Sequence, residues 1–137
     1  MAVDKKQLDE LILQLENHVE CWKQFNHYIS LARSKKFTQD DESQFLEIKS
    51  VLTQGLELIL SSIESGAPAR EEIYNLVSSA PSIRYLSELQ ENSLRAIENN
   101  WHKVFLAWQS ILGQMKVQQQ KAAGKGFFAS LFGGKKK

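Results

Sequence analysis

The clearest structural signal in the chain lies in residues 8–32, which read LDELILQLENHVECWKQFNHYISLA. Apolar residues recur there in alternating steps of four and three, and Asn26 fills the one polar position of the series. The apolar members are Leu8, Ile12, Leu15, Val19, Trp22 and Ile29. This spacing places them on one face of an α-helix. Leu11, Phe25 and Ala32 widen that face, so the segment predicts a helix buried along a broad stripe.

The ends of this predicted helix carry residues that stabilise helix termini. Asp4 is the predicted N-cap, because its carboxylate can accept hydrogen bonds from the free N–H groups of the first turn. Arg33, Lys35 and Lys36 come at the C-terminal end, where the helix dipole favours cations. About thirty residues at 1.5 Å each predict a rod about 45 Å long.

A second helix is predicted to begin at Thr38, which together with Asp41 matches a capping box. Its apolar stripe comprises Phe45, Ile48, Leu52, Ile59 and Ile63, with Val51, Leu56 and Leu60 beside it. Gly55 lies on this stripe, and we expect an aromatic ring to pack against it, because glycine permits close approach. The Ser-Gly-Ala-Pro sequence of residues 65–68 predicts the end of the helix.

Two more helices are predicted before the C-terminal segment. A short one begins at Pro68 and ends by Ala80, because Pro81 restricts the backbone of the residue before it. Ser82 is then the predicted N-cap of one last long helix, which continues to about Gln120. The seam of this helix comprises Leu86, Ser93, Ile97, Trp101, Val104, Trp108, Ile111 and Met115.

The predicted fold class is all-α, because no segment alternates apolar and polar residues over the length of a strand. Short connections make sequential long helices run antiparallel. We therefore expect an antiparallel up-down bundle of three long helices plus one short connecting helix over residues 1–120, followed by a flexible C-terminal tail over residues 121–137. Five aromatic residues are expected in the middle of the bundle: Trp22, Phe25, Trp101, Phe105 and Trp108.

Composition limits the chemistry that this body can perform. The 137 residues are 42% hydrophobic and 24% charged, which is typical of one globular domain. Cys21 is the single cysteine, so an intramolecular disulfide and a zinc site with several cysteines are both excluded. The sequence contains no glycine-rich phosphate loop and no nucleophile elbow.

Two residue pairs invite a chemical interpretation. His18 precedes Cys21 by about one helical turn, as a base and a nucleophile could, and Glu98 precedes His102 by one turn, as two metal ligands could. We predict neither role, because a smooth helical seam offers no oxyanion pocket and the Glu-x-x-His motif of bundle metal sites is absent. We also expect the three histidines to be surface groups. The sequence thus predicts a non-enzymatic protein with no catalytic residue, no metal and no cofactor.

Charge is distributed unevenly along the chain. The net charge of +1 combines a body of residues 1–115, which has eleven basic residues against all 16 acidic ones, with a segment of residues 116–137 that has six lysines and no acid. An anionic partner is therefore expected at the C-terminal segment. The acidic body disfavours nucleic acid as a partner.

The C-terminal segment has the composition of a docking peptide. Residues 121–137 read KAAGKGFFASLFGGKKK, and we expect Gly124 and Gly126 to break the preceding helix. The predicted partner- or membrane-binding residues are four apolar anchors with flanking lysines: Phe127, Phe128, Leu131, Phe132, Lys125, Lys135, Lys136 and Lys137. Such a segment can lie in a lipid interface or fold into a groove on another protein.

The leading hypothesis is an adaptor or scaffold that docks through this peptide to an anionic membrane surface or to a larger protein assembly. The first alternative is a self-assembling structural subunit, a homo-oligomer whose tail packs in a neighbouring copy. The second is a metal-binding protein of the four-helix type. Because the sequence contains neither a signal-peptide pattern nor a long apolar run, we expect a cytoplasmic protein that is peripheral wherever it meets a membrane.

Overall fold

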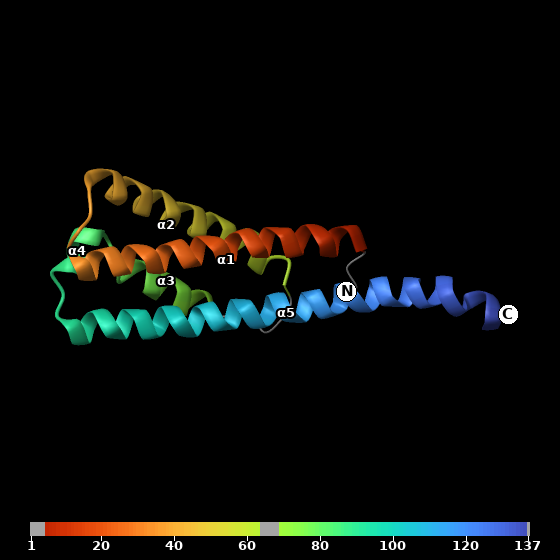
Figure 1. Ribbon diagram of the computed structural model, residues 1–137. Helices are drawn as coiled ribbons and strands as arrows, with labels where there is room; N and C mark the ends of the chain where they lie inside the picture. Colours follow the sequence, from red (N-terminus) through yellow and green to blue (C-terminus); the bar gives the residue numbers. More distant parts are fainter. Residues whose placement is uncertain (1–4, 64–68, 137) are drawn as a thin grey trace.

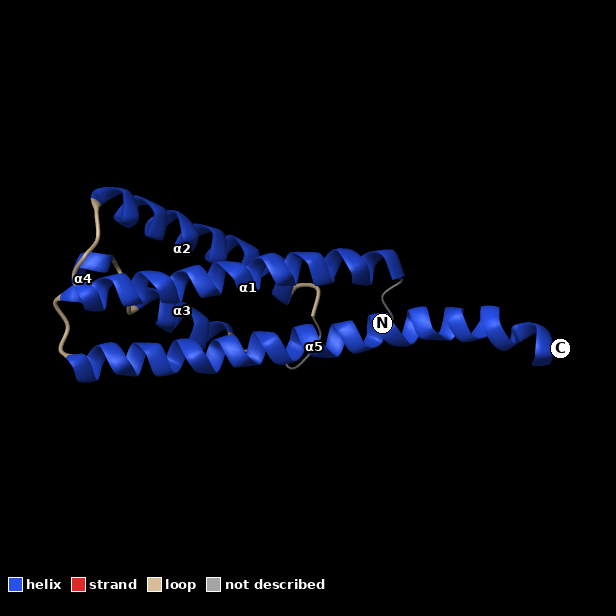
Figure 2. Ribbon diagram, viewed as in Figure 1, coloured by secondary structure: helices blue, strands red, loops and turns tan. Residues whose placement is uncertain are grey.

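The computed structural model describes residues 5–63 and 69–136, with side chains described up to residue 122. This part of the chain forms five helices and no strand, which confirms the all-α prediction (Figure 2). They are α1 (Lys5–Ser34), α2 (Gln39–Leu60), α3 (Arg70–Ser78), α4 (Ile83–Ser87) and α5 (Glu91–Lys136).

The longest helices lie side by side around α1. Helix α1 packs against α5, α2 and α4, and α3 packs against α5 (Figure 1). On its other side α3 reaches α2, because Arg70 and Tyr74 both donate hydrogen bonds to the carboxylate of Glu57. Helix α4 lies at the end of the molecule where α1 finishes and α5 begins (Figure 1).

The core follows the stripes expected from the sequence, except that Val51, expected beside the stripe of α2, is exposed. Every member of the apolar stripe predicted for α1 is buried, as are Phe45, Leu52, Leu56 and Ile59 of α2. Trp22, Phe25 and Trp108 are fully buried at its centre, while the stacked rings of Trp101 and Phe105 are half-buried, with centroids 4.8 Å apart. The indole N–H of Trp101 donates to the backbone oxygen of Trp22 over 2.7 Å, which fixes α5 against α1.

The connection between α1 and α2 contains the predicted capping box. Lys35 follows α1 with a φ of 59°, the left-handed conformation that often ends helices. The Thr38 hydroxyl accepts from the Asp41 N–H over 3.1 Å, and the Thr38 N–H donates to the Asp41 carboxylate over 2.8 Å. The predicted N-cap Asp4 lies outside the described residues, as does the sequence of residues 65–68 that was expected to end the second helix; α2 ends earlier, at Leu60.

The prediction of one continuous last helix is wrong, because the chain forms α4 and α5 instead. Ser82 does cap a helix, accepting from the Tyr85 N–H over 3.0 Å, but that helix ends at Ser87. The carboxylate of Glu42 on α2 accepts from the N–H groups of Ile83 and Arg84 over 2.8 and 2.9 Å, which holds the start of α4 against α2. After α4 the chain turns at residues 88–90. It then runs alongside α1 as α5, which starts at Glu91.

The change of direction also alters the buried face at the start of α5. Ser93, which the sequence pattern assigned to the seam, is exposed, and its neighbour Leu94 is buried instead.

The backbone of α5 remains helical through the segment predicted to be a tail. The breaks expected at Gly124 and Gly126 do not occur, and α5 continues to Lys136. Each glycine costs about 1 kcal/mol relative to alanine, but it retains its N–H and so preserves the helical hydrogen-bond pattern that proline would interrupt. Between residues 91 and 136 the sequence has no proline.

Candidate functional site

The predicted docking residues belong to the C-terminal part of α5. Positions 125–136 lie on this helix, whereas Lys137 and the side chains of residues 123–136 lie outside the described part of the structure. Near the start of α1, Gln119 donates to the Asp9 carboxylate over 2.8 Å and Lys116 pairs with Glu16 over 3.0 Å. The first described residue of α1 is Lys5, and the α5 backbone continues past it (Figure 1). At 1.5 Å per residue this extension is about 20 Å long.

Helical register separates the predicted anchors from the core-facing side of α5. Successive residues of an α-helix are about 100° apart, so positions 127, 128, 131 and 132 share an arc of about 140°. That arc lies roughly half a turn from the buried positions Trp108 and Met115. The C-terminal segment therefore does not continue the stripe that packs on α1.

Two exposed apolar side chains lie on this outer side of α5. Leu106 and Val117 are 52% and 49% exposed. They share this side of the helix with positions 128 and 131, but positions 110, 113, 121 and 124 between them are Ser, Gly, Lys and Gly, so the apolar residues on this side are not continuous. No helix in the described ranges combines the length and the apolar character needed to span a bilayer.

A second candidate site is a pocket between α1 and α2 with a volume of about 230 Å³. Its lining comprises Gln14, Asn17, His18 and Cys21 from α1 and Val51, Gly55, Leu58 and Ile59 from α2. Sequence reasoning singled out His18 and Cys21 as a pair but did not place them in a pocket.

His18 is only 4% exposed, so the expectation that all the histidines are surface groups is wrong for this residue. The Trp22 indole N–H donates to His18 Nε2 over 3.1 Å, and burial lowers the pKa of His18 to about 4. A neutral imidazole that accepts at Nε2 carries its proton on Nδ1. The signal was present in the sequence, since His18 lies between Leu15 and Trp22 on the buried stripe.

The imidazole of His18 is also the ring that packs against Gly55. A Cβ atom placed on Gly55 would lie 3.2 Å from His18 Nδ1, which is tighter than ordinary van der Waals contact. On its other side the imidazole meets the edge of Trp108, with centroids 5.0 Å apart. Within residues 5–63 and 69–122, the buried Trp108 Nε1 has no hydrogen-bond partner.

Neither of the two chemically suggestive pairs forms a reactive centre. Burial and the nearby Glu20 carboxylate raise the pKa of the Cys21 thiol, so the thiol is predominantly protonated at neutral pH. Glu98 binds Arg33 rather than pairing with His102. Among the described residues, no group of three or more His, Cys, Asp and Glu side chains is arranged to hold a metal ion.

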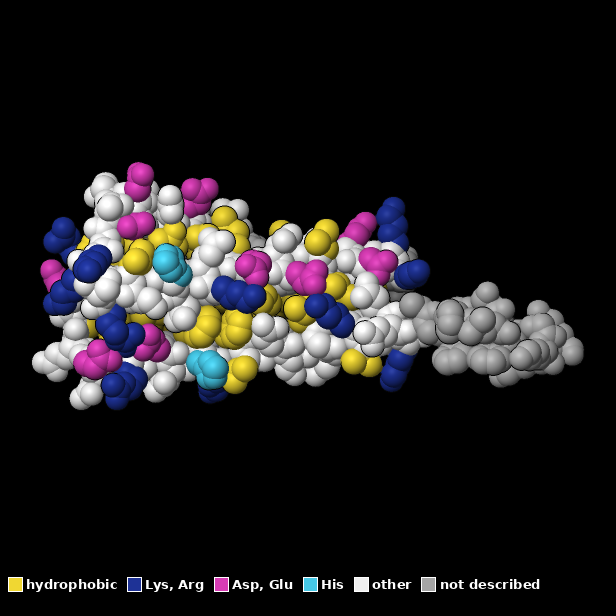
Figure 3. All heavy atoms as spheres, in the orientation of Figure 1, with side chains coloured by type: hydrophobic (Ala, Val, Ile, Leu, Met, Phe, Trp, Pro, Cys, Tyr) yellow, Lys and Arg dark blue, Asp and Glu magenta, His cyan; other side chains and the backbone are white. Residues whose placement is uncertain are grey.

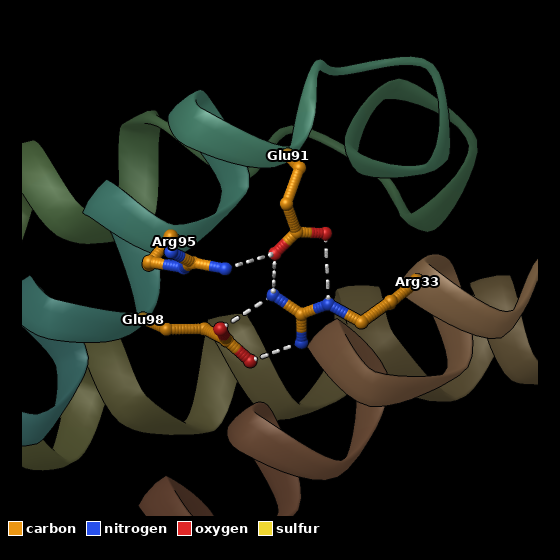
Figure 4. Close-up of polar contacts among 4 residues, drawn as sticks. All are labelled: Arg33, Glu91, Arg95 and Glu98. Carbon is orange, nitrogen blue, oxygen red and sulfur yellow. Dashed lines mark hydrogen bonds and ion pairs between the residues drawn. The ribbon is translucent and has the colours of Figure 1, made fainter.

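The densest polar cluster joins the end of α1 to the start of α5 (Figure 4). Arg33 donates to both carboxylate oxygens of Glu91, over 3.2 and 3.0 Å, and also to both oxygens of Glu98. Arg95 adds an ion pair to Glu91 over 3.7 Å. These hydrogen bonds raise the pKa of Arg33 and lower that of Glu91, so the cluster stays charged at neutral pH and acts as a structural clamp.

Apolar side chains also reach the surface along the junctions of the helices (Figure 3). The fold and the two candidate sites define an all-helical protein with an extended last helix and a small pocket between α1 and α2. Comparison of the chain with protein-family models, curated proteins and solved structures found no match.

Proposed function

We propose that the protein is a non-enzymatic adaptor or scaffold: an antiparallel up-down helical bundle that docks to an anionic membrane surface through the C-terminal part of α5. The carriers are the apolar anchors Phe127, Phe128, Leu131 and Phe132, with Lys125, Lys135, Lys136 and Lys137 supplying electrostatic attraction. The observation that carries the proposal is the course of α5, whose backbone continues past the first described residue of α1.

The helical register supports this proposal. The segment's apolar arc lies about half a turn from the bundle-facing side of α5, so packing on α1 does not use it. A helical segment whose apolar arc has lysines before and after it in the sequence can lie in the lipid interface, with its rings among the acyl chains and its lysines extended toward the headgroups. Each lysine near an anionic surface contributes about 1 kcal/mol to binding.

The charge distribution supports an anionic target. All 16 acidic residues precede the C-terminal segment, and residues 116–137 contain six lysines. Attraction of this kind weakens as salt increases, because exposed charges are screened over about 8 Å at physiological ionic strength.

Removal of residues 124–137 tests the proposal. The truncated protein should retain its helical circular dichroism signal and its melting transition, except for the lost helix, because the described core lies before residue 116. The full chain should co-sediment with vesicles of phosphatidylcholine and phosphatidylserine, and the truncated chain should stay in the supernatant. Equal sedimentation of the two proteins would refute the proposal.

The nature of the target is resolved by the same assay. Binding to anionic vesicles that is lost with pure phosphatidylcholine identifies the membrane surface as the target. A larger protein assembly remains the alternative for this segment, and it predicts no vesicle binding, together with a complex that forms only with the full chain.

A second candidate function is self-assembly, which the exposed Leu106 and Val117 on the outer side of α5 favour. Two copies that pair along this side would cover both of these exposed apolar side chains. Light scattering separates the candidates: a dimer or larger species in lipid-free buffer, dissociated by Leu106→Glu with Val117→Glu, would support self-assembly.

A further inference from the structure

The pocket between α1 and α2 is separate from the C-terminal segment of α5 and has a lining of two kinds. Val51, Leu58, Ile59 and the half-buried Cys21 make most of its wall apolar, while the amides of Gln14 and Asn17 lie at exposed positions. None of its eight lining residues carries a formal charge at neutral pH, since His18 is neutral there. A ligand that entered this pocket would meet no counter-charge, so a neutral ligand is favoured over an ion.

His18 supplies one fixed hydrogen-bond donor to this apolar lining. Its Nε2 is occupied by the Trp22 indole, which leaves Nδ1 as the protonated nitrogen on the side of Gly55. The imidazole is 4% exposed and packs edge-on against Trp108, which holds Nδ1 in one orientation at the wall of the pocket. A donor held at an apolar wall gains from an acceptor brought in by a ligand.

Gly55 keeps the donor accessible. A Cβ atom at this position would lie 3.2 Å from Nδ1, closer to that nitrogen than to any other atom of the surroundings. Glycine inside a helix costs about 1 kcal/mol of stability relative to alanine. At position 55 the missing Cβ atom leaves room beside the imidazole.

The volume sets the size of the ligand. A dry apolar cavity of about 150 Å³ accommodates benzene, so 230 Å³ accommodates a single ring with a short substituent. We propose that the pocket binds a small, uncharged, predominantly apolar molecule with one hydrogen-bond acceptor, such as an aryl or alkyl ketone, and that the acceptor binds the Nδ1–H of His18.

Acetophenone and ethylbenzene are a matched pair of probes for this site, because they are similar in shape and only the ketone has an acceptor. Cys21 supplies the readout, since it is the single cysteine and lines the pocket. Acetophenone should slow the reaction of Cys21 with 5,5′-dithiobis(2-nitrobenzoate) in a saturable manner. It should also bind about fivefold more tightly than ethylbenzene, as expected for one net hydrogen bond.

Three variants of the full chain sharpen the test. His18→Phe keeps a ring but removes the donor, so the preference for acetophenone should disappear. Gly55→Ala crowds Nδ1 and should weaken acetophenone binding, whereas Gly113→Ala, the same change where an added Cβ meets nothing within 4 Å, should leave binding unchanged. If His18→Phe fails to give a helical circular dichroism spectrum, the two glycine variants still decide the case.

Each contrary outcome overturns a stated part of the proposal. Equal protection by the two probes in the unmodified protein would overturn the role of the His18 donor. Absence of saturable protection would overturn the pocket as a ligand site, and equal binding by the Gly55→Ala and Gly113→Ala variants would overturn the role of the space beside Nδ1.

Discussion

His18 is buried in its neutral form, and three uncharged neighbours surround its imidazole. Trp22 donates to Nε2, Trp108 packs edge-on against the ring, and Gly55 leaves space beside Nδ1. None of these three neighbours carries a charge that would favour the imidazolium form. Burial therefore dominates and holds the pKa of His18 at about 4, below its ordinary value of 6.5.

The depressed pKa of His18 predicts an acid-dependent loss of stability. Between about pH 6.5 and pH 4 the unfolded chain binds a proton at His18 that the folded chain does not, so the free energy of unfolding falls as the pH falls through this window. Urea unfolding at about pH 7 and about pH 4.5 should differ by about 2 to 3 kcal/mol from this residue. His18→Phe should remove this contribution.

The carboxylates of Glu57 and Glu91 titrate in a lower window and can be separated from His18. Hydrogen bonds lower the pKa values of Glu57 and Glu91 from 4.5, so their contributions are present above that pH and are lost only as the pH falls below it. An unfolding free energy that is flat between about pH 6.5 and pH 4.5 would contradict the assigned state of His18.

At the scale of single elements, side-chain caps fix where the helices begin. The Thr38 and Asp41 box starts α2, and the Glu42 carboxylate of α2 holds the first N–H groups of α4. These two contacts hold the chain at the turn between α1 and α2 and at the start of α4.

Replacing Thr38 with alanine should destabilise the protein by about 1 kcal/mol, because the N–H of Asp41 loses its side-chain acceptor. Thr53→Ala is the matched control, since Thr53 is the other threonine of the chain and donates only to Lys49 within α2. Urea unfolding measures both variants. A Thr38→Ala variant no less stable than Thr53→Ala would disprove the capping assignment.

Glu42→Ala should loosen α4 specifically. The N–H groups of Ile83 and Arg84 lose a charged acceptor, a change of about 1.5 to 3 kcal/mol. Amide hydrogen exchange at these two residues should accelerate, while exchange in the middle of α1 stays the same. Glu47→Ala, an exposed change on the same helix, should leave the α4 amides unaffected.

At the scale of the whole molecule, local patterns predicted the helices but not every boundary between them. The stripe of α1 and the Thr38 box depend on neighbours within a turn or two, so the sequence pattern was sufficient. The Glu42 carboxylate that holds the start of α4 lies on a different helix, and residues 82–94 give no local sign of that contact.

The candidate sites also combine features that local sequence pattern predicts with features that depend on how the helices pack. The burial of His18 could have been predicted from its place on the stripe, but its contact with Gly55 requires α1 and α2 to be packed. The pocket therefore could not be derived from spacing alone. In the C-terminal segment the glycines predict a break in the helix, and this prediction is wrong, because α5 continues through them.

Docking through the C-terminal part of α5, as proposed, requires its four apolar anchors as well as its lysines. Full-length protein and a variant with Phe127, Phe128, Leu131 and Phe132 all changed to serine are sedimented with phosphatidylserine-containing vesicles at equal concentration. Every lysine is retained in the variant, so charge is constant. We expect the unmodified chain to sediment with the vesicles and the variant to stay in the supernatant; equal sedimentation of both would refute docking through these anchors.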